Sequence, residues 1–184
     1  MLAEERDAMA NEFVLTKTAA NRSGILSAVT RAMAELDGDL RELSQTVVRG
    51  YFTMIFSAEF PDGLTEDVVR AHIEDTCRPF AIDVGLKNPE QDGLPGQSVD
   101  LPDIHILRMG GDNHSGVLRE LSTVISMHQA DIVGMRAIRV ELSGGFEMVM
   151  KVAVPRGFDI HALLTALGEA GKGYNITVDA PGSE

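Results

Sequence analysis

The sequence predicts an α+β protein in which one βαββαβ module occurs twice. The segment Asn-Arg-Ser-Gly-Ile-Leu at Asn21–Leu26 returns as Asn-His-Ser-Gly-Val-Leu at Asn113–Leu118, a shift of 92 residues. In both copies this segment follows a short apolar run and opens a stretch in which apolar residues have helical spacing. Later in each copy, apolar and polar residues alternate, which indicates a half-buried strand. These three observations together predict the fold class.

The repeat keeps its register along the whole module. At the shift of 92, Leu15 matches Leu107 and Asp39 matches Asp131. Two residues are added in the Ser143-Gly144-Gly145 region, and the shift is 94 from there on. Turns tolerate insertions, so one register change at a glycine-rich turn is what a duplication predicts. Pairs matched at the second shift include Phe52 with Phe146, Met54 with Met148, Pro61 with Pro155 and Ile82 with Ile176.

The expected order of elements is strand, helix, strand, strand, helix, strand, which is the ferredoxin-like plan. One packed and one wetter strand face predict antiparallel sheets that helices cover on one side. In the first copy the expected elements are Phe13–Thr18, a helix with Ile25, Val29, Met33 and Leu36, Asp39–Val48, a strand with Phe52, Met54, Phe56, Ala58 and Phe60, Thr65–Cys77, and Ile82–Leu86. In the second they are Ile104–Met109, a helix with Val117, Leu121 and Ile125, Asp131–Leu142, a strand with Phe146, Met148, Met150, Val152 and Val154, Asp159–Ala170, and Tyr174–Asp179.

The chain is expected to have four parts. Residues 1–11 form a mobile acidic tail, 12–87 the first module, 88–102 a linker rich in proline, glycine and polar residues, and 103–180 the second module. A module of this size has a thin core and an open sheet edge or face. Side-by-side pairing of the two copies would cover it, in one extended sheet or as two facing sheets. The pair within one chain is sufficient for this, or two chains associate; we expect a homo-oligomer, most simply a dimer.

Composition limits the classes of function. The net charge of −12, from 16 basic and 28 acidic residues, repels phosphate backbones and argues against direct nucleic-acid binding. No apolar run approaches the ~20 residues that span a bilayer, so no membrane association is expected. A single cysteine, Cys77, excludes an intrachain disulfide and fits a cytoplasmic protein. We expect Cys77 to be a buried small hydrophobe.

The repeated loop is the candidate functional segment. Serine just before a helix can cap its free N–H groups, and glycine lets a ligand approach the backbone. Free N–H groups and the helix dipole favour a carboxylate, and the asparagine adds an amide that donates and accepts. A small carboxylate-bearing molecule is therefore the expected ligand. The alternative is that each loop is only a helix cap and tight turn, which common ancestry would also preserve.

The loop and the order of elements resemble the ACT domain, whose signature here is Asp or Asn, one variable residue, Pro or Ser, then Gly and two aliphatic residues. The resemblance covers residues 13–87 and 103–180. The tandem arrangement is similar to that of the glycine cleavage system transcriptional repressor family. It implies a regulatory protein that binds an amino acid between modules and acts through a protein partner, in control of amino-acid metabolism or transcription. The ligand-binding residues it implies are Asn21, Arg22, Ser23, Gly24 and Ile25, with Asn113, His114, Ser115, Gly116 and Val117.

Other functions find less support. Five histidines form no His-x-x-x-His pair, and no nucleophile–base set, metal motif or cofactor motif is found, so no enzyme, metal or cofactor is expected. A module that only pairs with others and binds no small molecule stays open as the alternative. Met109-Gly110-Gly111-Asp112 precedes the second loop, which predicts that this loop is more mobile and that the two sites differ.

Overall fold

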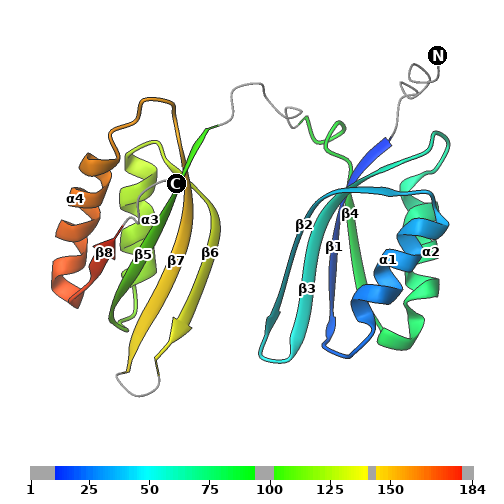
Figure 1. The fold of residues 1–184 in the computed structure, drawn as a ribbon, viewed down its shortest axis with the longest axis horizontal. Coiled ribbons are helices and arrows are strands. Elements are labelled where there is room, and N and C mark those ends of the chain that lie inside the picture. The colour runs from blue at the N-terminus through cyan, green and yellow to red at the C-terminus, as the bar shows by residue number, and fades with distance from the viewer. Residues whose placement is uncertain (1–10, 94–101, 141–143, 180–184) are drawn as a thin grey trace, which may run out of the picture. The chain divides into compact units, whose positions relative to one another are not determined.

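The computed structural model describes residues 11–93, 102–140 and 144–179. The chain divides into two compact units, Met1–Ser98 and Val99–Glu184, each described here by itself. Each unit holds one four-stranded antiparallel sheet with two α-helices on one face (Figure 1). Most of the expected tail and residues 94–101 of the expected linker lie outside the described residues.

The two units have the same topology. The strand order is β2-β3-β1-β4 in the first unit and β6-β7-β5-β8 in the second. This equivalence confirms the α+β, ferredoxin-like duplication. The elements are β1 (Asn11–Ala20), α1 (Ile25–Glu35), β2 (Asp39–Val48), β3 (Tyr51–Phe60), α2 (Glu66–Thr76), a 3-10 turn (Arg78–Phe80) and β4 (Asp83–Lys87), then β5 (Asp103–Asp112), α3 (Val117–Met127), β6 (Asp131–Arg139), β7 (Gly145–Val154), α4 (Ile160–Gly171), a 3-10 turn (Lys172–Tyr174) and β8 (Thr177–Asp179).

Each core lies between the sheet and its two helices. The predicted inner faces of β3 and β7 are confirmed: every second residue from Phe52 to Phe60 and from Met148 to Val154 is buried, and Phe146 is half-buried. The predicted apolar faces of α1 and α3 pack against them. Because burying a large apolar side chain contributes about 1.5–3 kcal/mol, these faces supply most of the stabilisation of each unit. The buried helix residues are Ile25, Val29 and Met33 in α1 and Val117, Leu121 and Ile125 in α3.

The predicted bounds of two strands of the second unit are wrong. The last strand begins at Thr177 and not at Tyr174, which lies in a 3-10 turn. Strand β5 does not stop at Met109 but continues to Asp112, so Gly110 and Gly111 pair with Glu147 and Phe146 of β7. A Cβ on Gly111 would lie 2.9 Å from the carbonyl oxygen of Asn175 and 3.0 Å from Cα of Ile176. The glycine therefore allows close backbone approach rather than loop motion.

The first core contains a buried lysine. Lys17 on β1 has no exposed surface, and its Nζ lies 5.5 Å from the ring centroid of Phe56 with no hydrogen-bond partner among the described residues. Burial lowers its pKa from 10.5 to about 8, against the opposing effect of Cys77 and Glu74. Cys77 is buried as predicted, and burial raises the pKa of its thiol. The repeat places Met109 and Gly171 at the positions of Lys17 and Cys77.

Candidate functional site

The two repeated loops begin their helices with glycine rather than serine. Gly24 and Gly116 are the N-cap residues, with left-handed φ angles of 94° and 97°, and neither helix has a side-chain cap. The prediction that serine caps these helices is therefore wrong: Ser23 and Ser115 lie one residue too early to reach the first free N–H groups. Glycine occupies the cap because other residues strain at this φ.

This geometry predicts that the loop serines contribute little to stability. Ser23→Ala and Ser115→Ala should each change the free energy of unfolding by less than about 0.5 kcal/mol. Asp159 is the matched control, because its carboxylate accepts hydrogen bonds from the N–H groups of His161 and Ala162 at the start of α4. Asp159→Ala should cost about 1 kcal/mol in urea denaturation. An equal loss in a serine variant would show that the serine does cap its helix.

The glycine caps leave helix N–H groups free. The Ala28 N–H donates to the Gly24 carbonyl, and the Glu120 N–H donates to the Gly116 carbonyl. The first-turn N–H groups before them have no backbone partner among the described residues, as helix geometry requires. These groups belong to Leu26 and Ser27 in the first unit and to Leu118 and Arg119 in the second. Each helix start therefore offers N–H donors and the positive end of a helix dipole.

In the second unit the loop borders a hollow of about 280 Å³. Of the predicted residues, four line it and Ser115 does not. The rest of the lining comes from Leu118 of α3, the end of β6 and the start of β7, which the sequence did not indicate as parts of a site. The lining is Asn113, His114, Gly116, Val117 and Leu118 from the loop and α3, Ala137, Ile138 and Arg139 from β6, and Phe146 and Met148 from β7.

Arg139 is the charged side chain that the strands bring to this hollow. It pairs with Phe146 in the β6–β7 ladder, forms no ion pair with any described residue, and is exposed. The repeat places Val47 at its position and Arg22 at the position of His114. At these two pairs of equivalent positions each unit thus has one arginine. It is on the loop in the first unit and on the edge strand β6 in the second. Comparison of the two copies could have indicated Arg139, because the second copy loses the loop arginine and gains one on the strand.

Three contacts join the second loop and its flanking residues to the segment before β8. The His114 ring lies 5.7 Å from the Tyr174 ring, and the Tyr174 hydroxyl donates to Glu120 Oε1 at 2.8 Å. This hydrogen bond raises the pKa of Tyr174. Asn175 Nδ2 donates to Asp112 Oδ2 at 2.7 Å, just before the loop. These contacts connect the second loop and the start of α3 to the segment before β8.

The loop of the first unit has different neighbours. The Asn21 N–H donates to the Gly50 carbonyl in the β2–β3 turn at 2.8 Å, and Gly24 lies beside the Phe80 ring. Asn21, Arg22, Ser23 and Gly24 are exposed, whereas Ile25 is buried in the core. The two loops therefore share a backbone conformation but differ in the side chains around them.

The described residues contain no group of three or more His, Cys, Asp or Glu side chains that could hold a metal ion. Their helices are all too short or too polar to cross a membrane. The chemistry of the second loop is that of recognition: N–H donors, a guanidinium, an amide and an apolar wall.

The fold is that of two ferredoxin-like modules in tandem, which fits the ACT-like arrangement that the sequence resembles. A protein of unknown function from Galdieria sulphuraria has the same fold, with a TM-score of 0.77 at 17% identity over 95% of this chain and 99% of that one. A candidate glycine cleavage system transcriptional repressor superposes with a TM-score of 0.69 at 11% identity, over 96% of this chain and all of the other. Both likenesses concern the fold alone.

The sequence relatives identify the family. No family model matches the chain. A UPF0237 protein of Corynebacterium glutamicum is 32% identical over 73 residues, which cover 40% of this chain and 79% of that protein. A UPF0237 protein of Corynebacterium diphtheriae is 38% identical over 53 residues, covering 29% of this chain and only 60% of that protein. The chain belongs to the UPF0237 family.

Proposed function

We propose that this protein is a non-enzymatic regulator that binds a small amino acid in the hollow at the start of α3. The observation that carries the proposal is that Arg139 and the first residues of α3, whose N–H groups are free, line one hollow. Both recognise a carboxylate, the guanidinium by paired hydrogen bonds and the helix start by N–H donors and its dipole.

The rest of the lining fits the other parts of an amino acid. The amide oxygen of Asn113 can accept a hydrogen bond from an ammonium group. Phe146, Met148 and Leu118 form an apolar wall for a short side chain. A few polar groups on an apolar surface are the usual composition of a small-molecule site. The exposed edge of the hollow suits a ligand that a second module would cover.

The hollow lies beside the edge strand β6, where a bound ligand can influence the pairing of this edge with another protein. This edge exposes Val133 and Met135, and the equivalent edge strand β2 exposes Leu43 and Val47. Exposed apolar residues at a sheet edge are typical of a pairing surface. A ligand beside that edge changes the affinity for a second subunit or a partner protein as far as it favours one paired state. We expect a homodimer in the cytoplasm that acts through a protein partner.

Arg139→Gln tests the ligand site. A thermal-shift screen of the wild-type protein against each standard amino acid should find one that stabilises it, by about 2.7 kcal/mol at a ligand concentration ~100 times Kd. Arg139→Gln should lower the affinity for that ligand at least about tenfold, because a charge-assisted hydrogen bond contributes about 1.5–3 kcal/mol. Lys151→Gln removes the same charge from the opposite face of the same sheet and should leave the affinity unchanged.

A pairing module without a small ligand is the second candidate, and the exposed edge residues of β2 and β6 favour it. It predicts no thermal shift with any amino acid and a dimer whose sedimentation is the same with and without them. A regulator instead retains a partner protein in pull-down to an extent that depends on the amino acid.

A further inference from the structure

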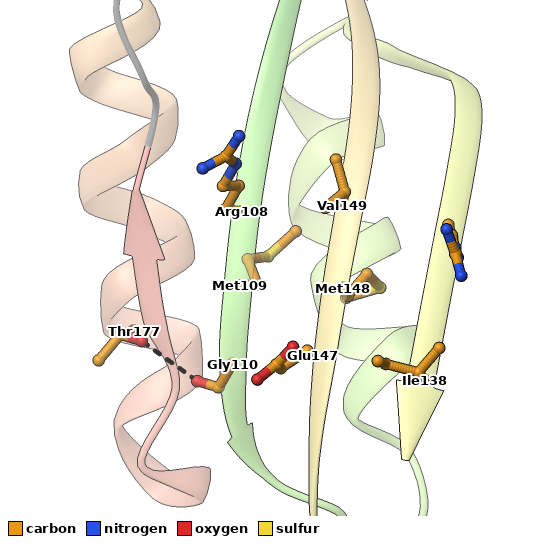
Figure 2. Close-up of a pocket in the computed structure, with 9 residues that line it drawn as sticks. Arg108, Met109, Gly110, Ile138, Glu147, Met148, Val149 and Thr177 are labelled. Atoms are coloured by element: carbon orange, nitrogen blue, oxygen red, sulfur yellow. Dashed lines mark hydrogen bonds between the residues drawn. The ribbon is translucent and has the colours of Figure 1, made fainter. Parts of the chain in front are cut away.

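The second unit has another hollow, on the sheet face opposite the helices. Its volume is about 500 Å³, and it lies over β5, β7 and β6 (Figure 2). Arg108, Arg136, Glu147, Ile138 and Val149 are among the residues that line it. It borders the hollow at the α3 start, with which it shares Ile138 and Met148, but the charged residues that line it belong to this hollow alone.

Strand register places the charged residues in two neighbouring rows. Arg108 pairs with Val149 and Val149 pairs with Arg136, so the two arginines flank one valine on the same face. Because adjacent strands lie about 4.8 Å apart, the Cα atoms of the two arginines are roughly 10 Å apart. In the next row Glu147 lies between Gly110 and Ile138.

Gly110 leaves space beside Glu147, its partner on β7. It has no side chain on this face, and its carbonyl accepts a hydrogen bond from Thr177 Oγ1 at 3.3 Å (Figure 2). Ile138 and Val149 are 48% and 42% exposed and form an aliphatic floor beside the charges. The hollow therefore combines two cations, one anion and an apolar floor.

The charges are uncompensated within the described part of the chain. Neither arginine nor Glu147 forms an ion pair there. The fold does not demand them either, because the repeat places Thr16, Ser44 and Thr53 at the positions of Arg108, Arg136 and Glu147. Thr18 stands where the second copy has Gly110. One copy of the same sheet thus carries a charged, open face and the other a neutral hydroxyl-bearing one.

We propose that this hollow binds an acidic amino acid, a zwitterion with two carboxylates and one ammonium group. The two carboxylates contact Arg108 and Arg136, whose guanidiniums form paired hydrogen bonds with such groups. The ammonium group contacts Glu147, and the ligand's methylene groups lie over Val149. The charges match in number and sign, two negative and one positive against two positive and one negative. None of the three charged residues of this site lines the proposed site at the start of α3.

NMR titration of the isotope-labelled full chain with L-glutamate tests the site. We expect saturable shifts of the Val149 methyl signals, because Val149 lines this hollow and not the one at the start of α3. L-Glutamine, which lacks the second carboxylate, should bind about tenfold more weakly, as should glutarate, which lacks the ammonium group. Arg108→Gln and Arg136→Gln should each weaken L-glutamate about tenfold, whereas Lys151→Gln on the same face should not. Glu147→Gln should remove the preference for L-glutamate over glutarate.

Arg139→Gln separates this site from the one at the start of α3. It should leave the L-glutamate shifts at Val149, which does not line the α3 hollow, unchanged, whatever it does to amino-acid binding at the loop. Shifts confined to Gly116 and Leu118, or no saturable shift at Val149, would overturn the proposal. So would shifts at Val149 that depend on protein concentration instead of L-glutamate, because a second copy of the chain would then cover this face.

Discussion

Replacing Lys17 with methionine is expected to stabilise the first unit by roughly 3 kcal/mol. This is the cost of the lowered pKa of Lys17, since each pKa unit corresponds to about 1.4 kcal/mol. Burial lowers the pKa of Lys17 from 10.5 to about 8, so at neutral pH the fold holds a charged amine at the cost of its desolvation. Methionine occupies the equivalent position, Met109, in the second core. Two units need not unfold together, so urea unfolding is followed by the Met54 methyl signal of the first unit.

The same lysine gives the first unit a defined pH dependence. Between pH 8 and 10.5 the unfolded chain holds a proton on Lys17 that the folded chain has released, so stability rises with pH across this interval. Below pH 8 both states are protonated and the cost is constant. The stability difference between Lys17→Met and the wild type should therefore shrink from pH 8 to 10.5. A difference that is constant over this interval would mean that the folded-state pKa of Lys17 is unperturbed.

Met109→Lys is the reciprocal variant. It places an amine in the second core, where Cys77 has no equivalent, and should destabilise that unit by several kcal/mol, on the order expected for an unpaired buried charge. If the second unit tolerated this lysine without loss, burial of the amine would not explain the behaviour of Lys17.

Gly111→Ala is expected to destabilise the second unit by about 1–3 kcal/mol, the usual cost of overpacking. The added methyl would lie within 3.0 Å of backbone atoms of Asn175 and Ile176, which cannot rotate away as a side chain could. Gly110→Ala is the matched control, because its Cβ would meet only the Phe146 carbonyl oxygen, at 3.4 Å. The two melting temperatures, compared by circular dichroism, should differ clearly. Equal and small losses would indicate a mobile loop at these glycines.

Periodicity predicted most of the fold, because burial on one face dictates it. The alternation from Phe52 to Phe60 and the spacing of Ile25, Val29 and Met33 each specify one side of an element, and both patterns occur twice. The end of β5 escaped prediction because two glycines are typical of a turn. They belong to a strand here because the backbone of Asn175 and Ile176 lies too close to leave room for a side chain. These residues are far from the glycines in the sequence, so local patterns do not reveal the contact.

The site was predicted only in the part that is continuous along the chain. Asn113, His114, Gly116 and Val117 line the hollow, but Arg139, Phe146 and Met148 reach it through the pairing of β6 with β7. The cap was misassigned because serine is a good helix cap in general, whereas the left-handed backbone here requires glycine. Lys17 was not singled out, since one lysine in a strand pattern does not reveal its burial.

The central claim, that a small amino acid binds at the start of α3, is tested most directly by the backbone amides of this helix. The ¹⁵N-labelled chain is titrated with a mixture of the standard amino acids, and then with each of them. We predict saturable downfield shifts of the Leu118 and Arg119 amide protons, as they donate to a carboxylate, and a ligand requirement at least about tenfold higher for these shifts in Arg139→Gln. Amide signals at Leu118 and Arg119 that do not move with any amino acid would contradict the account.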